Sequence, residues 1–206
     1  PQPASAVVYG DEAALGNGTV RTYVVVEAGA PVEVGVALSE AALAGLPDHE
    51  SPGGIMMPEG LKTFEYVLPM PAENPTPFRH VTVDWNPGGH TPPGIYDVPH
   101  FDIHFYTITE AERRAIDPAD PEFMQKALSY PSTEYGPAGY VVPAPEPVPF
   151  MGVHWVDPAS PEFAGAPFDK TFIYGTWDGA LIFIEPMVTR AYLETRPDFQ
   201  APVATA

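Results

Sequence analysis

The sequence contains no cysteine, and this absence excludes several kinds of chemistry at once. Disulfide bonds, thiolate catalysis, zinc ribbons and iron–sulfur clusters all require cysteine. A transition-metal site in this chain would therefore have to use histidine, aspartate, glutamate or methionine. The sequence also lacks a G-x-S-x-G nucleophile elbow, a phosphate-binding loop and a dinucleotide fingerprint, so enzymes built on those motifs are not indicated.

Basic residues are scarce: 9 lysines and arginines stand against 27 acidic residues, giving a formal net charge of -18. Such a surface repels phosphate backbones and attracts cations, so we expect no nucleic-acid partner. No apolar run approaches the ~18 residues of a membrane-spanning helix, so no transmembrane segment is expected. The chain begins with the small and polar stretch PQPASA, which is typical of an exported protein after removal of its signal peptide. We therefore expect the protein in the periplasm or cell envelope.

The 28 prolines and 18 glycines predict many turns and few long helices. Between the turns, β-branched and alternating runs predict eight or nine strands with two or three short inserted helices. Short connections favour antiparallel pairing, and an antiparallel β-barrel would leave no exposed sheet edge; a β-sandwich is the alternative. No internal repeat is apparent, and the C-terminal part is too small to be stable alone. We therefore expect one β-barrel-like domain over residues 1–206, with loose termini.

The segment PHFDIHFY, residues 99–106, has polar side chains at alternate positions. As a strand, it would turn its phenylalanines and isoleucine to one face and His100, Asp102 and His104 to the other. Residues four apart on a strand are separated by ~13 Å, so His100 and His104 could share an ion only at full stretch or on a bent strand. We expect Asp102 to orient a histidine ligand or to bind the ion itself.

Three residues from other segments could complete a metal shell. His90 lies in a glycine- and proline-rich loop that leads into the strand, and His154 lies at the centre of the predicted strand GVHWVD. Glu185 ends the apolar run LIFIE, where a buried carboxylate needs a cation, a donor or a metal. We expect His100, His104 and His154 as ligands, with His90 or Glu185 completing the shell. For each residue alone, the alternative is a structural role in the core or at its rim.

The types of donor atom indicate which metal ions the site would bind. Imidazole-rich sites suit zinc, copper, iron or nickel. For an exported protein without thiolates, copper and zinc are the leading choices.

Three segments, GGHTPPGIYDVPHFDIHFY, MGVHW and YGTWDGALIFIEPMVTRAYL, resemble a small β-barrel-like bacterial family of the Thermus and Deinococcus lineage that is associated with envelope stress. The resemblance covers about residues 80–195, and its most specific parts are PHFDxHFY and EPMVT. It implies a copper-only superoxide dismutase of the cell envelope, associated with the surface layer (S-layer) and similar to a Deinococcus member. It further implies copper as cofactor, superoxide as the small-molecule substrate, and a ring-like homo-oligomer within an envelope or S-layer complex.

Two features depart from the usual copper–zinc superoxide dismutases. Their His-x-His pair and stabilising disulfide are replaced here by His-x3-His and no cysteine. Superoxide is also an anion, which a net charge of -18 repels unless Arg79, Arg113 or Arg114 guides it to the site. The alternatives to a dismutase are a non-enzymatic, metal-stabilised oligomeric scaffold of the envelope and a hydrolase or lyase in which zinc activates water.

Overall fold

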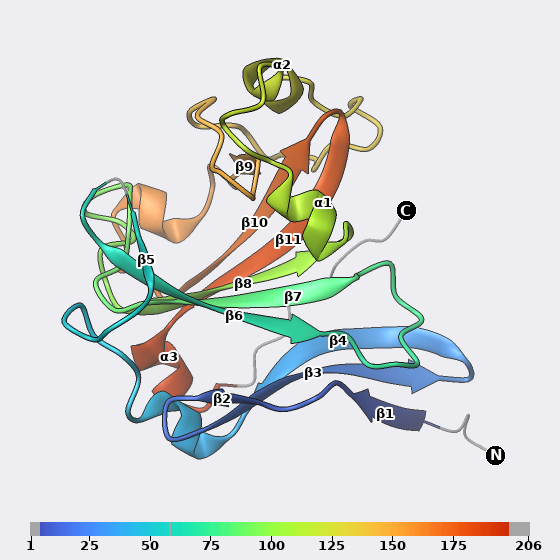
Figure 1. Ribbon diagram of the computed structural model, residues 1–206, viewed down its shortest axis with the longest axis vertical. Coiled ribbons are helices and arrows are strands. Elements are labelled where there is room, and N and C mark those ends of the chain that lie inside the picture. Colours follow the sequence, from blue (N-terminus) through green and yellow to red (C-terminus); the bar gives the residue numbers. More distant parts are fainter. Residues whose placement is uncertain (1–4, 58, 198–206) are drawn as a thin grey trace.

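The computed structural model describes residues 5–57 and 59–197 and contains two antiparallel sheets (Figure 1). The four strands of the smaller sheet, with β3 at its centre, are β1 (Ser5–Tyr9), β2 (Ala13–Leu15), β3 (Gly18–Glu27) and β4 (Ala30–Leu38). The larger sheet has the order β5-β6-β7-β8-β11-β10-β9. Its strands are β5 (Ile55–Met56), β6 (Lys62–Pro69), β7 (His80–Asn86), β8 (His100–Tyr106), β9 (Val153–Trp155), β10 (Lys170–Trp177) and β11 (Ala180–Thr189).

The helices are short, as the proline content predicts. The three α-helices are α1 (Glu110–Arg114), α2 (Phe123–Ala127) and α3 (Arg190–Glu194), and two 3-10 turns are η1 (Glu40–Leu43) and η2 (Pro161–Ala164). No helix in the described ranges is long and apolar enough to cross a membrane.

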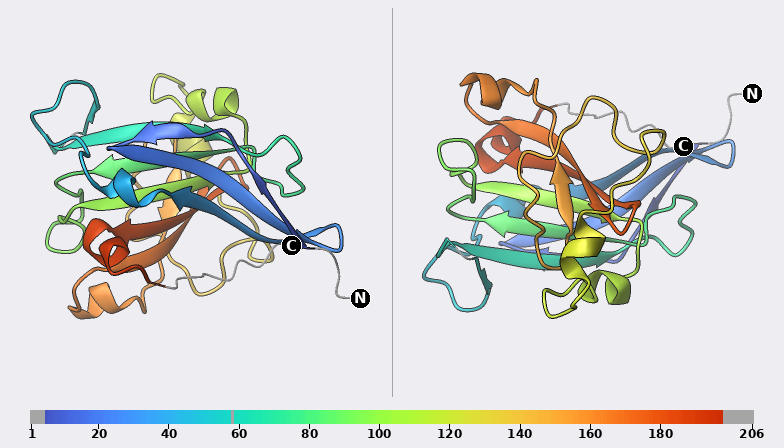
Figure 2. Two further views of the ribbon diagram at one scale, coloured as in Figure 1. Left: turned by 90° about the horizontal axis from the view of Figure 1, so that it is seen from below. Right: turned by 90° about the horizontal axis from the view of Figure 1, so that it is seen from above.

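The seven-stranded sheet curls into a half-barrel, and the four-stranded sheet lies across its outer side (Figure 2). The mainly β, antiparallel architecture with three short helices is therefore confirmed. Among the described residues the edge strands β5 and β9 do not pair with each other, so the sheet remains open. The strands that the sequence did not predict are β1, β2 and β5, whose short lengths give little periodicity to detect.

Two local sequence signals, a turn and a helix cap, have the structure that their residues predict, and a third does not. Asp178 and Gly179 both have positive φ, 47° and 78°, in the tight turn between β10 and β11. The spacing of Thr109 and Glu112 in the sequence predicts a capping box, and the two residues form it at the start of α1. The segment SEAALAGLPD predicts a short helix capped by Ser39, but the Oγ of Ser39 accepts a hydrogen bond from the backbone of Thr19, and only the 3-10 turn η1 follows.

Strand β8 separates two buried faces of the molecule. Phe101, Ile103 and Phe105 point toward the smaller sheet and pack in a core that includes Leu15 and Val20, which confirms the predicted apolar face. Fully burying one such side chain stabilises the fold by about 1.5–3 kcal/mol. All seven residues of β8 are buried, because α1, α2, β9 and long loops cover the concave face of the half-barrel (Figure 2). The polar side chains of β8 therefore lie inside the protein.

Candidate metal centre

The register of the sheet collects acidic and imidazole side chains on the concave face. Strand β7 pairs with β8 so that Asp84 lies opposite Asp102. On the other side of β8, the pairs that flank Glu185 of β11 place it opposite His104. Successive positions of one strand face are ~6.6 Å apart, so these groups form one contiguous polar patch. The patch divides into two groups of possible metal ligands.

The first group consists of His104, His154 and Glu185 and is called the β11 group here. Nε2 of His104 lies 3.4 Å from Oε1 of Glu185, and Nε2 of His154 lies 3.6 Å from Oε2 of the same carboxylate. One ligand atom from each residue lies within 4.8 Å of the others, so the three side chains could hold one metal ion. His104 and Glu185 are buried, whereas the His154 side chain is 23% exposed. The group is thus buried on one side and open to solvent at His154.

The edge strand β9 brings His154 to this position. His154 pairs with Gly175 of β10, and the ring of Phe183 occupies the space where Gly175 has no side chain. A Cβ at Gly175 would lie 1.9 Å from Cε1 of that ring. The ring centroid of Phe183 is 4.9 Å from that of His104 and 5.2 Å from that of His154. Gly175 therefore makes room for the aromatic ring that packs against both imidazoles.

The orientation of the His104 ring is fixed by contacts of its Nδ1 atom, on the side away from Glu185. Its Nδ1 lies 3.0 Å from Oδ2 of Asp84, which also accepts a hydrogen bond from Oγ1 of Thr82 at 3.0 Å. An ionised carboxylate only accepts hydrogen bonds, so the ring carries its proton on Nδ1 and turns Nε2 toward Glu185. Metal-binding histidines are usually held in this way by a carboxylate or a carbonyl.

The second group consists of His90, His100 and Asp102 and is called the loop group here, because His90 belongs to the loop of residues 87–99. Nε2 of His90 lies 3.1 Å from Oδ2 of Asp102, and Nε2 of His100 lies 3.1 Å from Oδ1. Asn86 donates a hydrogen bond from Nδ2 to Oδ2 of the same carboxylate at 2.8 Å. These three residues also have ligand atoms within 4.8 Å of one another.

Backbone carbonyls orient both imidazoles of the loop group. Nδ1 of His90 lies 2.7 Å from the carbonyl oxygen of Thr91, and Nδ1 of His100 lies 2.7 Å from that of Val98. A carbonyl oxygen can only accept, so each ring donates from Nδ1. Both Nε2 atoms are thereby directed at Asp102.

Both groups contain buried polar atoms that make no hydrogen bond within the described chain. In the loop group these are Nε2 of His100 and Oδ1 of Asp102, and in the β11 group they are Nε2 of His104 and Oε2 of Glu185. Leaving such an atom unsatisfied costs about 1–3 kcal/mol. Two acceptor atoms that face each other at close range repel unless a proton or a cation lies between them. These nitrogen and oxygen donors therefore fit a transition-metal ion.

The charges of the β11 group depend on one another. Burial by itself would lower the pKa of His104, but the carboxylates of Glu185 and Asp84 raise it to about 9. Burial raises the pKa of Glu185 to about 8, against the opposing effect of His104. Burial and the nearby charge of His104 lower the pKa of His154 to about 3. The raised pKa values of His104 and Glu185 mean that the metal-free group retains protons near neutral pH, while His154 stays neutral.

In the loop group, too, burial and neighbouring charges shift the pKa values in opposite directions. Burial disfavours the charged form of His90, yet Asp102 raises its pKa to about 9. Burial also disfavours an ionised Asp102, but His100 and His90 bring its pKa well below the ordinary value. In the absence of a metal, a proton on His90 balances the buried carboxylate.

The structure gives each predicted site residue a definite place. His104, His154 and Glu185 come together, as do His90 and Asp102, but His100 joins the loop group and not the group of His104. The single shell expected from the sequence is thus divided between two places on β8. Asp102, expected to orient or to bind, faces two imidazoles at once.

Sequence reasoning missed Asp84 and Asn86 as partners of the site. The alternation of the sequence pairs Asp84 with His80, but the His80 ring stacks on Tyr106 at 4.8 Å and belongs to neither group. The detectable signal was the alternation of HVTVDWN, which places His80, Asp84 and Asn86 on one face of β7.

The three arginines considered as guides for an anion have different surroundings. The side chain of Arg113 is 1% exposed and contacts Glu65, with its guanidinium 5.2 Å from the ring centre of Tyr106. It is therefore a buried structural cation. Arg79 and Arg114 are exposed, and Arg114 is paired with Glu110 at 2.7 Å. Of the three arginines, only these two are open to solvent.

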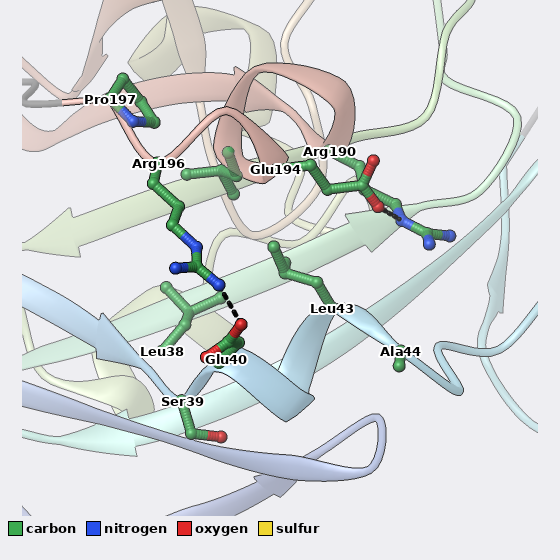
Figure 3. Close-up of a pocket in the computed structure, with 10 residues that line it drawn as sticks. Leu38, Ser39, Glu40, Leu43, Ala44, Arg190, Glu194, Arg196 and Pro197 are labelled. Carbon is green, nitrogen blue, oxygen red and sulfur yellow. Dashed lines mark hydrogen bonds and ion pairs between the residues drawn. The ribbon is translucent and has the colours of Figure 1, made fainter.

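A surface hollow elsewhere on the molecule is unrelated to this site. It has a volume of about 650 Å³ and lies between η1 and α3, lined in part by Leu43 and Arg190 (Figure 3). Arg196 contacts Glu40 across it. Its lining contains no histidine, so the candidate centre remains the concave face of the half-barrel.

Comparisons with known proteins cover little of the chain. Residues 26–85 match the family described as TTHB210-like, hypothetical protein TTHB210. No curated protein and no solved structure matches the chain. The matched stretch agrees with a likeness to a Thermus family, but it overlaps the segments that carry the resemblance, about residues 80–195, only at residues 80–85. It includes Asp84 but none of the six residues of the two groups.

Proposed function

We propose that this protein is an exported, histidine-rich metalloprotein of the cell envelope that acts as a copper-dependent, superoxide dismutase-like antioxidant. The main observation in favour of a metal ion is the geometry of the buried His104. Its Nδ1 is held by Asp84, and its Nε2 faces Glu185 without a hydrogen bond from any described residue. The choice of copper and superoxide, the homo-oligomer and the envelope or S-layer complex are supported by the family resemblance of residues 80–195.

The β11 group is the better candidate for the copper. His104, His154 and Glu185 would supply three ligands, and three protein ligands leave a coordination position for a small anion. Bound copper would supply one-electron exchange, oxidising one superoxide to dioxygen and reducing the next, with two protons, to hydrogen peroxide. The partly exposed side of His154 would admit superoxide, Asp84 would keep the His104 ring in place, and Phe183 would exclude water from one wall.

The experiment compares copper-loaded proteins for superoxide decay measured by pulse radiolysis. His154→Asn removes one ligand at a partly exposed position, and His49→Asn is the control, because His49 belongs to neither group. Losing a side chain that only orients a metal ligand already costs up to about 100-fold, so we expect His154→Asn to lose at least that much and His49→Asn to equal the wild type. Equal rates for wild type and His154→Asn would refute the proposal.

Zinc is the alternative cofactor, because two imidazoles and one carboxylate also form catalytic zinc sites. With zinc, the group would activate water for hydrolysis or lyase chemistry. The other alternative, a metal-stabilised scaffold without activity, would need the ion only for stability. Metal analysis of protein purified from its native source separates these alternatives. Bound copper favours the dismutase, and bound zinc favours the other two.

A further inference from the structure

We infer that the loop group, His90, His100 and Asp102, is a second divalent-cation site, and that an ion there fastens the loop of residues 87–99 onto β8. The inference rests on the proposed function only in taking the β11 group as the place of the first ion. It changes the expected metal content of the chain from one ion to two.

Two donors of the loop group, Nε2 of His100 and Oδ1 of Asp102, are buried without a hydrogen bond in the described part of the chain, whereas Nε2 of His90 contacts Oδ2 of Asp102 at 3.1 Å. The His100 side chain is 0% exposed and that of Asp102 is 8% exposed. Nε2 of His100 and Oδ1 of Asp102 lie 3.1 Å apart, yet neither makes a hydrogen bond within the described ranges. Because Nδ1 of His100 contacts the carbonyl of Val98, its Nε2 is the ring nitrogen that points at the carboxylate. A cation bound between these two atoms would give both of them a partner.

The remaining contacts leave the same donors available. Asn86 occupies Oδ2 of Asp102 through Nδ2, which leaves Oδ1 for an ion. Nδ1 of His90 contacts the carbonyl of Thr91, so its Nε2 also points into the group. Two imidazole nitrogens and one carboxylate oxygen are a donor set that zinc and copper accept.

The two groups are too far apart on β8 to share one ion. His100 and His104 are four residues apart on the strand, a Cα separation of ~13 Å. The rings also have different neighbours: the centroid of His100 is 5.4 Å from that of Phe168, whereas His104 packs against Phe183 at 4.9 Å. Each imidazole therefore faces its own carboxylate, Asp102 or Glu185.

An ion in the loop group would connect separate segments of the chain. His90 comes from the loop of residues 87–99, whereas His100 and Asp102 belong to β8. The loop is closed on itself by the hydrogen bond from the backbone of His90 to the carbonyl of Tyr96 at 3.1 Å. An ion bound to His90 would tie this closed loop to the strand, so local opening of the loop would require release of the metal.

Zinc is the probe for the experiment, because it needs no redox activity of the protein. Metal-free full-length protein is dialysed against Zn²⁺, and bound zinc per chain is measured by mass spectrometry. We expect two zinc ions in the wild type and in the control His49→Asn, one in His90→Asn and one in His154→Asn. Both altered positions are partly exposed, at 21% and 23%, and circular dichroism checks that each variant folds.

Amide hydrogen exchange gives a second readout, and its comparison of wild-type protein with and without zinc does not depend on the folding of any variant. Zinc should slow exchange in residues 87–99 at least about fivefold in the wild type and in His154→Asn but not in His90→Asn. One zinc per wild-type chain, two zincs retained in His90→Asn, or loss of both ions from either variant would overturn the second site. Unchanged exchange in the zinc-loaded wild type would overturn the fastening of the loop.

These outcomes separate the two proposals. Protein that binds two zinc ions but shows no dismutation when loaded with copper would contradict the proposed function and support the second site. Protein that dismutates superoxide with a single ion per chain would do the reverse.

Discussion

Oδ2 of Asp84 lies 3.0 Å from Nδ1 of His104, across the neighbouring strands β7 and β8. This contact decides which imidazole nitrogen faces Glu185. Asp84→Asn keeps the size of the side chain but offers a neutral amide, so the ring loses its anionic anchor. We predict that Zn²⁺ affinity at the β11 group falls about 10- to 100-fold, measured by competition with a chelator. An unchanged dissociation constant would show that Asp84 does not position the ligand.

The metal-free protein should be less stable in mild alkali. The pKa values of His104 and His90 rise from 6.5 to about 9 and that of Glu185 from 4.5 to about 8, so the folded state holds protons that the unfolded chain has lost. The stabilisation from the two histidines is complete below pH 6.5 and is lost as the pH rises through about 9, and that from Glu185 is lost through about 8. The lowered pKa of His154 reduces the stability of the folded state only below pH 6.5, so it does not affect this range. Calorimetry should therefore show Tm falling from pH 6.5 to above pH 9, and a level or rising Tm would contradict the charge assignment.

Gly175 should not tolerate a side chain. Gly175→Ala places a Cβ 1.9 Å from Cε1 of Phe183, so the ring must move away from His104 and His154. Overpacking of this kind costs about 1–3 kcal/mol. We expect a lower free energy of unfolding by urea denaturation and weaker metal binding at the β11 group. Gly136→Ala is the matched control, because its Cβ would meet only the carbonyl of Ser132 at 3.6 Å. Equal losses in both variants would argue against a specific role for Gly175.

Exposed arginines should matter for the capture of superoxide. The net charge of -18 repels an anion, and Arg79 and Arg114 are the exposed members of the three arginines considered as guides. Replacing both by serine should lower the dismutation rate and weaken its dependence on ionic strength, because a local attraction is removed. Arg190→Ser serves as the control, since its partner is Glu194 on α3. If the double variant kept the salt dependence of the wild type, steering by these arginines would be refuted.

The sequence predicted most of the larger sheet because its strands are long and strongly patterned. The two faces of β8, the Asp178–Gly179 turn and the capping box at Thr109 follow from local chemistry. Strands β1, β2 and β5 have 5, 3 and 2 residues, which is too short for a periodic signal.

The division of the site could be predicted only in part. Strand spacing already indicated that His100 and His104 are nearly too far apart to share an ion. Which carboxylate each histidine faces depends on the register of β7 and β11 against β8, and register is a tertiary property. Asp84 therefore could not be assigned to His104 from the sequence alone.

The central claim is that the concave face of the half-barrel binds copper through its histidines. The most direct test is metal analysis of the protein purified from its native source, for the wild type and for a variant that combines His90→Asn with His154→Asn. The account predicts copper in the wild type and none above background in the double variant. Wild-type protein without any transition metal, or copper retained in the double variant, would contradict it.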